Sequence, residues 1–265
     1  MLKSVELLIN LGYSNKDAED ITSSYPLVTL KDETLCKKIN ENFNYLIDLG
    51  YTKDDVIKMT RHFPSLYSYN KETIEEKISF LVSLGYTKAN IIKMTKLVPS
   101  LYSYSKETIE EKISFLISLG YTKNDIIKMT KILSSLYGLT KENIKEKISF
   151  LISLGYTMID IIKMTNQFPA LYSLSKENIK DKIKYLRDIG LENIVINDTR
   201  QLMQSVFLTY ARYEFLTKEK EILIDESNYR KLFCGETNFK KQYGVSKNVL
   251  LKKYSYEKYK GSIKS

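Results

Sequence analysis

Residues 76–110, EKISFLVSLGYTKANIIKMTKLVPSLYSYSKETIE, are followed at once by residues 111–145, EKISFLISLGYTKNDIIKMTKILSSLYGLTKENIK. Of these 35 aligned positions, 24 are identical and 11 differ. The glycine that follows Leu or Ile in each copy recurs along the chain, at Gly12, Gly50, Gly85, Gly120, Gly155 and Gly190. The spacings are 38 and then four times 35 residues. A fixed period of this length is typical of a solenoid, in which each repeat stacks on its neighbours.

The first helix of a repeat is predicted to begin at a polar N-cap residue and to end at the glycine. The N-cap residues are each followed by Lys-Glu and are Asn70, Ser105, Thr140 and Ser175. Gly120 can take the left-handed conformation that ends a helix, and Tyr121 is placed for the usual apolar contact. Three extra residues between Pro26 and Gly50 predict a longer first helix there.

The second helix of a repeat is predicted to begin at a threonine and to end near a proline. Thr52, Thr87, Thr122 and Thr157 each precede Asp or Asn by three residues, which resembles a capping box. Apolar residues then follow the helical period. All four prolines stand 14 residues after a repeat glycine, at Pro26, Pro64, Pro99 and Pro169. They predict the helix end and a tight 3₁₀ turn. Ser134 replaces proline in one repeat.

We therefore predict an all-α fold, an α-solenoid over residues 1–190 with a helical cap and a basic Lys- and Tyr-rich tail over residues 191–265. The repeats fall near residues 1–40, 41–75, 76–110, 111–145, 146–180 and 181–215, the last one degenerate. Residues 198–216 are predicted to form one long amphipathic helix, and two short helices are predicted around Gly244. A helix-turn-helix motif is the less favoured alternative there, because Lys240 stands where that motif needs a small residue.

Composition narrows the class of protein. No apolar run approaches the roughly 20 residues that cross a membrane, so we expect a soluble protein. The N-terminus resembles neither a signal nor a transit peptide, and we expect a cytoplasmic location unless a leader has been removed. Cys36, Cys234 and His62 lack the spacing of a metal site or of a disulfide framework. No catalytic constellation is present, and we expect a non-enzymatic monomer without metal or cofactor.

Positive charge gathers in two parts of the chain. The net charge is +9, with 36 Lys and 5 Arg. Residues 76–180 and 216–265 each carry +6, residues 1–75 carry −3, and residues 181–215 are neutral. A polyanion-binding protein arranges charge in this way. A lysine-rich surface that serves only solubility is an equally weighted alternative.

The string PSLYSYSKETIEEKISFLISLGYT, residues 99–122, resembles the repeat of the mitochondrial transcription termination factor (mTERF) family. The resemblance covers roughly residues 1–216 and is carried by the four prolines and by Leu27, Leu66, Leu101 and Leu171. It implies about six repeats of three helices whose concave, basic face binds double-stranded DNA or structured RNA, in transcription termination, transcription regulation or ribosomal RNA maturation. Lysine replaces the arginine expected on that face and lacks the fork that reads guanine.

Two columns of cations on the second helices are candidates for contacts to a phosphate backbone. Together with two arginines from the C-terminal region, the candidates are Lys58, Arg61, Lys93, Lys96, Lys128, Lys131, Lys163, Arg200 and Arg212. An ordinary solvated helix face is an equally weighted interpretation. A further column, Lys77, Lys112, Lys147 and Lys182, has acidic residues beside it and is interpreted as ordinary surface.

Variable positions four residues from the lysines are candidates for base reading. They are Asp54, His62, Ala89, Leu97, Asn124, Ile132, Ile159 and Gln167. The aliphatic members can equally be partly buried between repeats. Helices pack about 8–10 Å apart, so one repeat spans roughly three base pairs, which does not fit a code of one residue per base. The recurring tyrosines favour packing between repeats over base stacking.

These observations predict a nucleic-acid-binding α-solenoid that acts by occupying its site, with duplex DNA slightly favoured over structured RNA. The alternative is a protein-interaction scaffold that uses the concave face for an acidic protein partner.

Overall fold

The computed structural model describes residues 2–256, and the predicted tail beyond them, residues 257–265, lies outside the described part. Residues 2–256 contain helices, turns and bends but no strand, which confirms the all-α solenoid. In this part no single helix is long and apolar enough to cross a membrane, although Lys141–Ser153 and Met158–Gln167 together, bent by 118°, reach the length and composition of a span.

The chain forms two compact units, residues 1–139 and residues 140–265, called here the N-terminal and C-terminal units. This division falls inside the repeat array. The boundary between array and cap at residue 190 stays a prediction.

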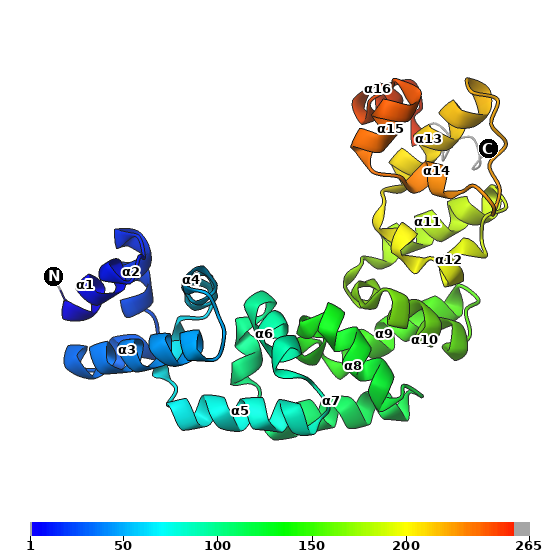
Figure 1. Cartoon of the computed structure of the whole chain (residues 1–265). Helices are drawn as coiled ribbons and strands as arrows, with labels where there is room; N and C mark the ends of the chain where they lie inside the picture. The colour runs from blue at the N-terminus through cyan, green and yellow to red at the C-terminus, as the bar shows by residue number, and fades with distance from the viewer. Residues whose placement is uncertain (1, 257–265) are drawn as a thin grey trace. The chain divides into compact units, whose positions relative to one another are not determined.

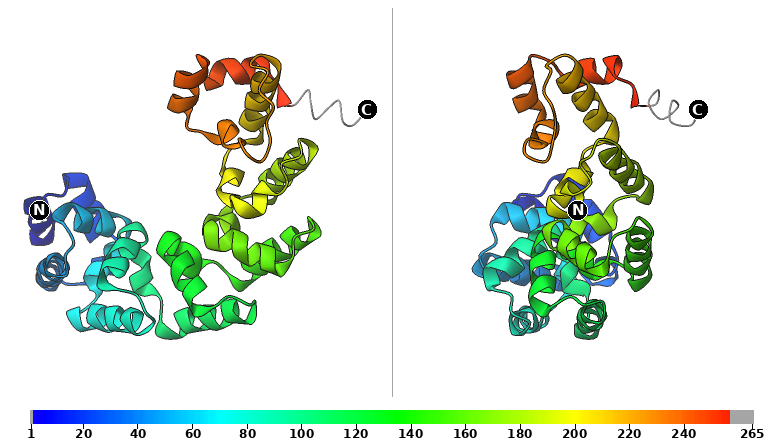
Figure 2. Two further views of the ribbon diagram at one scale, coloured as in Figure 1. Left: turned by 45° about the vertical axis from the view of Figure 1, so that its right-hand side comes forward. Right: turned by 90° about the vertical axis from the view of Figure 1, so that its right-hand side faces the viewer.

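The N-terminal unit contains alternating first and second helices joined by 3₁₀ turns (Figure 1). Its elements are α1 (Lys3–Asn10), α2 (Asn15–Thr22), η1 (Leu27–Thr29), α3 (Asp32–Asp48), α4 (Lys53–His62), η2 (Pro64–Ser68), α5 (Lys71–Ser83), α6 (Lys88–Leu97), η3 (Pro99–Ser103), α7 (Lys106–Ser118), α8 (Lys123–Ile132) and η4 (Ser134–Gly138). Contacts join α2 to α4, α4 to α6 and α6 to α8, so the second helices form one row. The first helices α1, α3, α5 and α7 form the other (Figures 1 and 2).

The C-terminal unit continues the same pattern and then adds short helices. Its elements are α9 (Lys141–Ser153), α10 (Met158–Gln167), η5 (Pro169–Ser173), α11 (Lys176–Asp188), α12 (Ile194–Asn197), η6 (Thr199–Met203), α13 (Val206–Lys218), α14 (Arg230–Phe233), α15 (Glu236–Tyr243) and α16 (Lys247–Lys253). The single long helix predicted over residues 198–216 is wrong, because η6 and α13 are separated at Gln204 and Ser205. The two short helices predicted around Gly244 are confirmed.

Local signals place most helix ends where the sequence predicts them. All four threonines make the full capping box, with Asp or Asn as its reciprocal partner. Helix α3 has 17 residues where the later first helices have 13, as predicted. Asn70 is an exception, because its side chain makes no cap bond and instead accepts a 2.7 Å hydrogen bond from Lys38.

The repeat glycine serves both the helix end and the next repeat. Gly85 has φ +105°, which a residue with a side chain rarely adopts. A Cβ at this position would also lie 3.2 Å from Cδ1 of Ile127 in α8, the second helix of the next repeat. Proline is less essential, because Ser134 begins a 3₁₀ turn of the same five-residue length as the proline-led turns.

Tyrosine hydroxyls link each repeat to the next within the N-terminal unit. The Tyr86 hydroxyl lies 2.5 Å from Thr130 Oγ1 and 2.7 Å from the Tyr137 hydroxyl. The same arrangement joins Tyr13 to Thr60 and Tyr67, and Tyr51 to Thr95 and Tyr102. These tyrosines are almost fully buried. The structure thus uses them for packing between repeats, and their rings are not available to stack on bases.

Substitution of Tyr86 by Phe is expected to lower the free energy of unfolding by about 1–2 kcal/mol, because it removes two buried hydrogen bonds, those to Thr130 and Tyr137. Tyr156 provides the matched control. Its ring is 5% exposed, and its buried hydroxyl has no hydrogen-bond partner among the described residues. Tyr156→Phe is therefore expected to be neutral or slightly stabilising. Urea unfolding followed by circular dichroism checks both variants, and equal losses would contradict the role given to the hydroxyl links.

Candidate nucleic-acid interface

Three lysines form a ladder of exposed cations on the second-helix row of the N-terminal unit. Lys58 in α4, Lys93 in α6 and Lys128 in α8 each stand eight residues after a repeat glycine. All three are exposed, and none makes a hydrogen bond or ion pair with the residues that the structure describes. The buried faces of the same helices, such as Ile91 and Met94 in α6, point the other way. These ammonium groups can therefore bind an anion from solution.

Charge separates between the two helix rows of this unit. Helix α6 carries three lysines and no acidic residue, α8 carries three lysines and one aspartate, and α4 carries three cations and two aspartates. In the first-helix row, α5 and α7 each carry two lysines and three glutamates, and α3 carries two lysines and four carboxylates. Helices α4, α6 and α8 of the second-helix row thus form the basic face of the N-terminal unit, whereas α2 carries one lysine and three carboxylates.

The second cation column is partly used within the protein. Arg61 Nε lies 3.0 Å from Asp17 Oδ1, and Lys96 Nζ lies 2.6 Å from Asp55 Oδ2. Each pair joins a second helix to an aspartate in the first turn of the preceding second helix. Lys131 is half-buried, and the capping-box residue of the helix before it is the uncharged Asn90. Arg61 and Lys96 are engaged in ion pairs, so the ladder Lys58, Lys93 and Lys128 is the column that stays unpaired, within residues 2–256, in all three helices, together with Lys53, Lys88 and Lys123 in their first turns.

The predicted cations of the C-terminal unit have different surroundings. Lys163 is exposed and donates a 2.8 Å hydrogen bond to Asn197 Oδ1, and Arg200 is exposed in η6. Arg212 is 1% exposed and cannot contact a phosphate, so its place among the candidates was wrong. The guanidinium of Arg212 lies inside the protein, where it donates hydrogen bonds to carbonyl oxygens.

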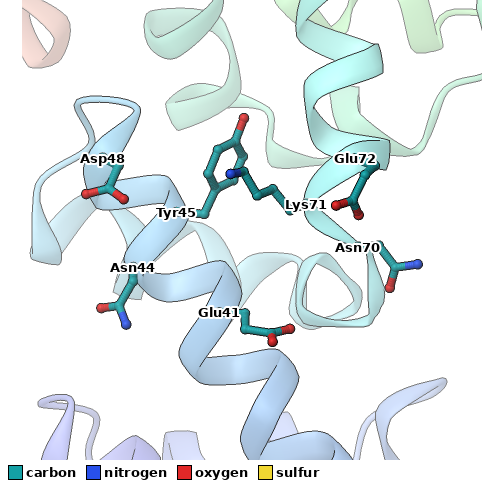
Figure 3. Close-up of a pocket in the computed structure, with 7 residues that line it drawn as sticks. All are labelled: Glu41, Asn44, Tyr45, Asp48, Asn70, Lys71 and Glu72. Carbon is teal, nitrogen blue, oxygen red and sulfur yellow. The ribbon is translucent and has the colours of Figure 1, made fainter.

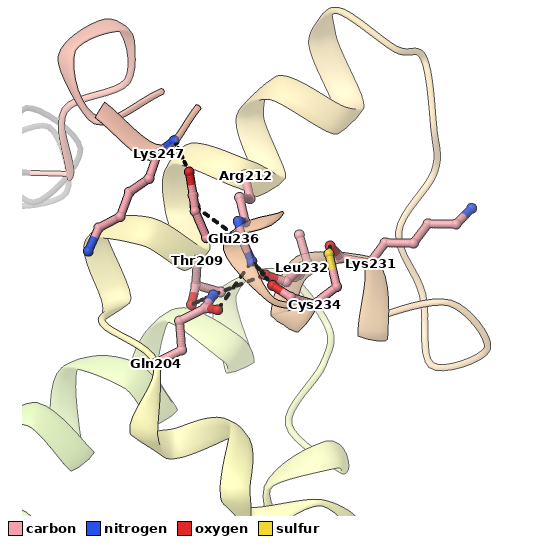
Figure 4. A network of polar contacts seen from close by, with 8 residues as sticks. All are labelled: Gln204, Thr209, Arg212, Lys231, Leu232, Cys234, Glu236 and Lys247. Atoms are coloured by element: carbon pink, nitrogen blue, oxygen red, sulfur yellow. Dashed lines mark hydrogen bonds and ion pairs between the residues drawn. The ribbon is translucent and has the colours of Figure 1, made fainter. Parts of the chain in front are cut away.

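The Arg212 guanidinium holds residues 232–236, called here the C-terminal segment, against α13 (Figure 4). Nη1 donates to the carbonyl oxygens of Leu232 at 2.9 Å and Cys234 at 2.6 Å, and to Gln204 Oε1 at 3.3 Å. Nη2 lies 3.4 Å from Glu236 Oε2, and the guanidinium carbon lies 4.3 Å from the Phe239 ring centroid. Arg212 is therefore a structural residue.

The predicted base-reading positions are mostly open to solvent. Asp54, His62, Ala89, Asn124 and the aliphatic side chains are exposed. Leu97 is 64% exposed, Ile132 55% and Ile159 79%, so burial between repeats does not apply to them. Gln167 differs, because it is half-buried and donates a 3.0 Å hydrogen bond to the carbonyl oxygen of Ile196.

The interpretation of the first-helix lysine column as ordinary surface is wrong. Lys112, Lys147 and Lys182 are 5%, 6% and 1% exposed, and Lys77 is half-buried. Lys77, Lys112 and Lys147 donate to the carbonyl oxygen that precedes the next N-cap residue, and Lys182 donates to Thr209 Oγ1. Burial lowers the pKa of Lys77 and Lys147 and places that of Lys182 well below its usual range. These lysines join successive first helices.

Comparison with known families decides where this array belongs. A family model described as mTERF matches residues 1–153 and, in a second overlapping segment, residues 96–197. The chain belongs to the mTERF family. That family is known for helical repeats that bind nucleic acid. No curated protein matches the chain.

One pocket of this mTERF array lies on the opposite helix row from the ladder. It has a volume of about 390 Å³ and lies between α3 and the start of α5, lined by Glu41, Asn44, Tyr45, Asp48, Asn70, Lys71 and Glu72. Figure 3 shows Lys71 beside the Tyr45 ring, whose centroid lies 5.1 Å from the ammonium nitrogen. Three carboxylates surround this one cation, so the pocket is unsuited to a phosphate.

Acid is expected to weaken the N-terminal part of the mTERF array through Asp55. Partial burial raises its pKa, but hydrogen bonds from Lys96 and Thr52 outweigh burial, and the pKa falls to about 2. A depressed carboxyl pKa stabilises the fold above the unfolded value of about 3.9, and this contribution is lost as pH falls through about 2.

Urea unfolding at about pH 5 and about pH 3 measures this loss. The Asp55→Asn variant keeps a residue that caps a helix, as Asn90 does, but cannot titrate. It is expected to lose less stability than the wild type between these two pH values. Equal losses would contradict the contribution of the Lys96–Asp55 pair.

Proposed function

We propose that this mTERF protein binds duplex DNA in preference to structured RNA, through the second-helix row of its N-terminal unit, and acts without enzymatic activity by occupying its site. The separation of charge between the two helix rows carries the proposal. A row of unpaired lysines opposite an acidic row attracts a polyanion from one side only. Site occupancy fits a role in transcription regulation or termination.

The chemistry of the row favours a backbone contact over a base contact. Lysine neutralises phosphate as a point charge and releases condensed counterions. Proteins that hold single strands supply aromatic platforms for successive bases. The recurring tyrosines of the N-terminal unit, such as Tyr86 and Tyr102, are buried and supply none. Single strands are therefore expected to bind more weakly than a duplex.

A protein-interaction scaffold is the second candidate, and one observation favours it. Leu97 and Ile132 are exposed at the ends of α6 and α8, four residues after Lys93 and Lys128. A surface that combines aliphatic and cationic side chains also fits an acidic, amphipathic helix of a partner.

Titration of the full chain with labelled nucleic acids tests the proposal. The probes are a duplex DNA, each of its single strands and a structured RNA hairpin, in salt from about 50 to about 200 mM. We expect the duplex to bind most tightly, with affinity falling linearly in a double-logarithmic plot against salt. Absence of binding to all probes at about 50 mM salt would overturn the proposal in favour of the scaffold.

A further inference from the structure

Helix α2, which begins the second-helix row, carries a carboxylate at the position where α4, α6 and α8 carry a lysine. The residue eight positions after the repeat glycine is Asp20 in α2, and its counterparts are Lys58, Lys93 and Lys128. All four side chains are exposed. Helix α2 packs beside α4 in the same row (Figure 1), where Arg61 pairs with Asp17. Asp20 therefore stands at the next position of the ladder.

The fold does not require a carboxylate at residue 20. Helix α2 is capped by the Ser14 side chain, which accepts a hydrogen bond from the Asp17 amide at 3.1 Å, and it buries Ala18 and Ile21. Asp20 makes no hydrogen bond or ion pair with any residue between 2 and 256. Exposed Glu19 lies beside it, and the two carboxylates outnumber the exposed Lys16.

We propose that Asp20 is the N-terminal end of the phosphate-binding surface. This inference rests on the proposed function. A phosphate opposite Asp20 would meet a like charge instead of a cation, and no counterion would be released there. Nucleic acid held by α4, α6 and α8 therefore stops short of α2. Asp20 thus limits the length of nucleic acid that the row can hold, without contacting it.

The Asp20→Lys variant tests the proposal as a gain of function. The variant should extend the ladder by one lysine, increase the salt slope by about 0.9 and raise duplex affinity several-fold at about 0.1 M salt. The shortest duplex that reaches full affinity should lengthen by roughly three base pairs, because neighbouring helices lie about 8–10 Å apart. Thermal unfolding confirms that the variant is folded.

Asp48→Lys is the matched control, since Asp48 is an exposed aspartate of the same unit on the first-helix row. It should leave the salt slope and the shortest saturating duplex unchanged. If the wild type binds but the two variants behave alike, the end-stop role of Asp20 is overturned and the proposed function stands. If the wild type binds no nucleic acid at all, both are overturned.

Discussion

Replacement of Lys58, Lys93 and Lys128 together by glutamine is expected to reduce duplex affinity on the order of 10- to 100-fold near physiological salt. Each lysine that neutralises a phosphate contributes about 0.9 to the salt slope, so the slope should fall by about 3. All three side chains are exposed and make no hydrogen bond or ion pair with the described residues, so the variant should fold with unchanged stability. Fluorescence anisotropy over a salt series measures both quantities.

A second triple variant controls for the loss of net charge. Lys37, Lys71 and Lys106 are exposed lysines of the same unit on the first-helix row, in α3, α5 and α7. Their replacement by glutamine removes the same charge from the face opposite the ladder. We expect a change in affinity of less than about threefold. If both triple variants weaken binding equally, the ladder is ordinary surface and only net charge matters.

Substitution of Arg212 by Met is expected to lower the free energy of unfolding by about 3–5 kcal/mol. Met keeps an apolar stem against Phe239 but leaves the buried carbonyl oxygens of Leu232 and Cys234 without their donor. The C-terminal segment should then detach from α13 and become sensitive to protease. Urea unfolding and limited proteolysis of the full chain detect these two effects.

Arg230→Met is the control for Arg212→Met, because the Arg230 side chain is 80% exposed and its contact to Asp198 is 3.8 Å long. It should change stability by less than about 0.5 kcal/mol.

Under conditions where the Arg212→Met variant remains folded, its affinity for duplex DNA should equal that of the wild type. A loss of affinity without a loss of stability would restore Arg212 as a phosphate contact.

Local signals made the repeat predictable. Thr87 and Asn90 lie three residues apart and cap one helix by contacts that the sequence alone brings together. The same holds for Gly85, whose left-handed backbone ends the helix before it. The split of residues 198–216 into η6 and α13 was missed. Residues 199–218 follow the turn-then-helix order of η5 and α11, and alignment of this segment to the repeat would have found the break.

The candidate interface was less accessible to sequence reasoning. Lys93 and Lys112 both recur at 35-residue intervals, and both have helical neighbours of mixed polarity. Lys93 is exposed, whereas Lys112 is buried and donates to a carbonyl oxygen 27 residues away. The acidic neighbours of Lys112 suggested a solvated face. A signal existed, because Asn42 stands at the position of Lys112 two repeats earlier, and its side-chain amide donates a hydrogen bond to the carbonyl oxygen of Tyr69.

The amino-acid sequence by itself determined the period, the helix pairs and the points where helices begin and end, because caps, glycines and apolar stripes act over about four residues. Only the tertiary structure decided which cations remain available. Arg212 and Lys182 are buried and donate hydrogen bonds to acceptors that lie 20 or more residues away in the sequence. Burial of a long charged side chain depends on such distant partners, and the ladder Lys58, Lys93 and Lys128 is what the packing of successive repeats leaves exposed.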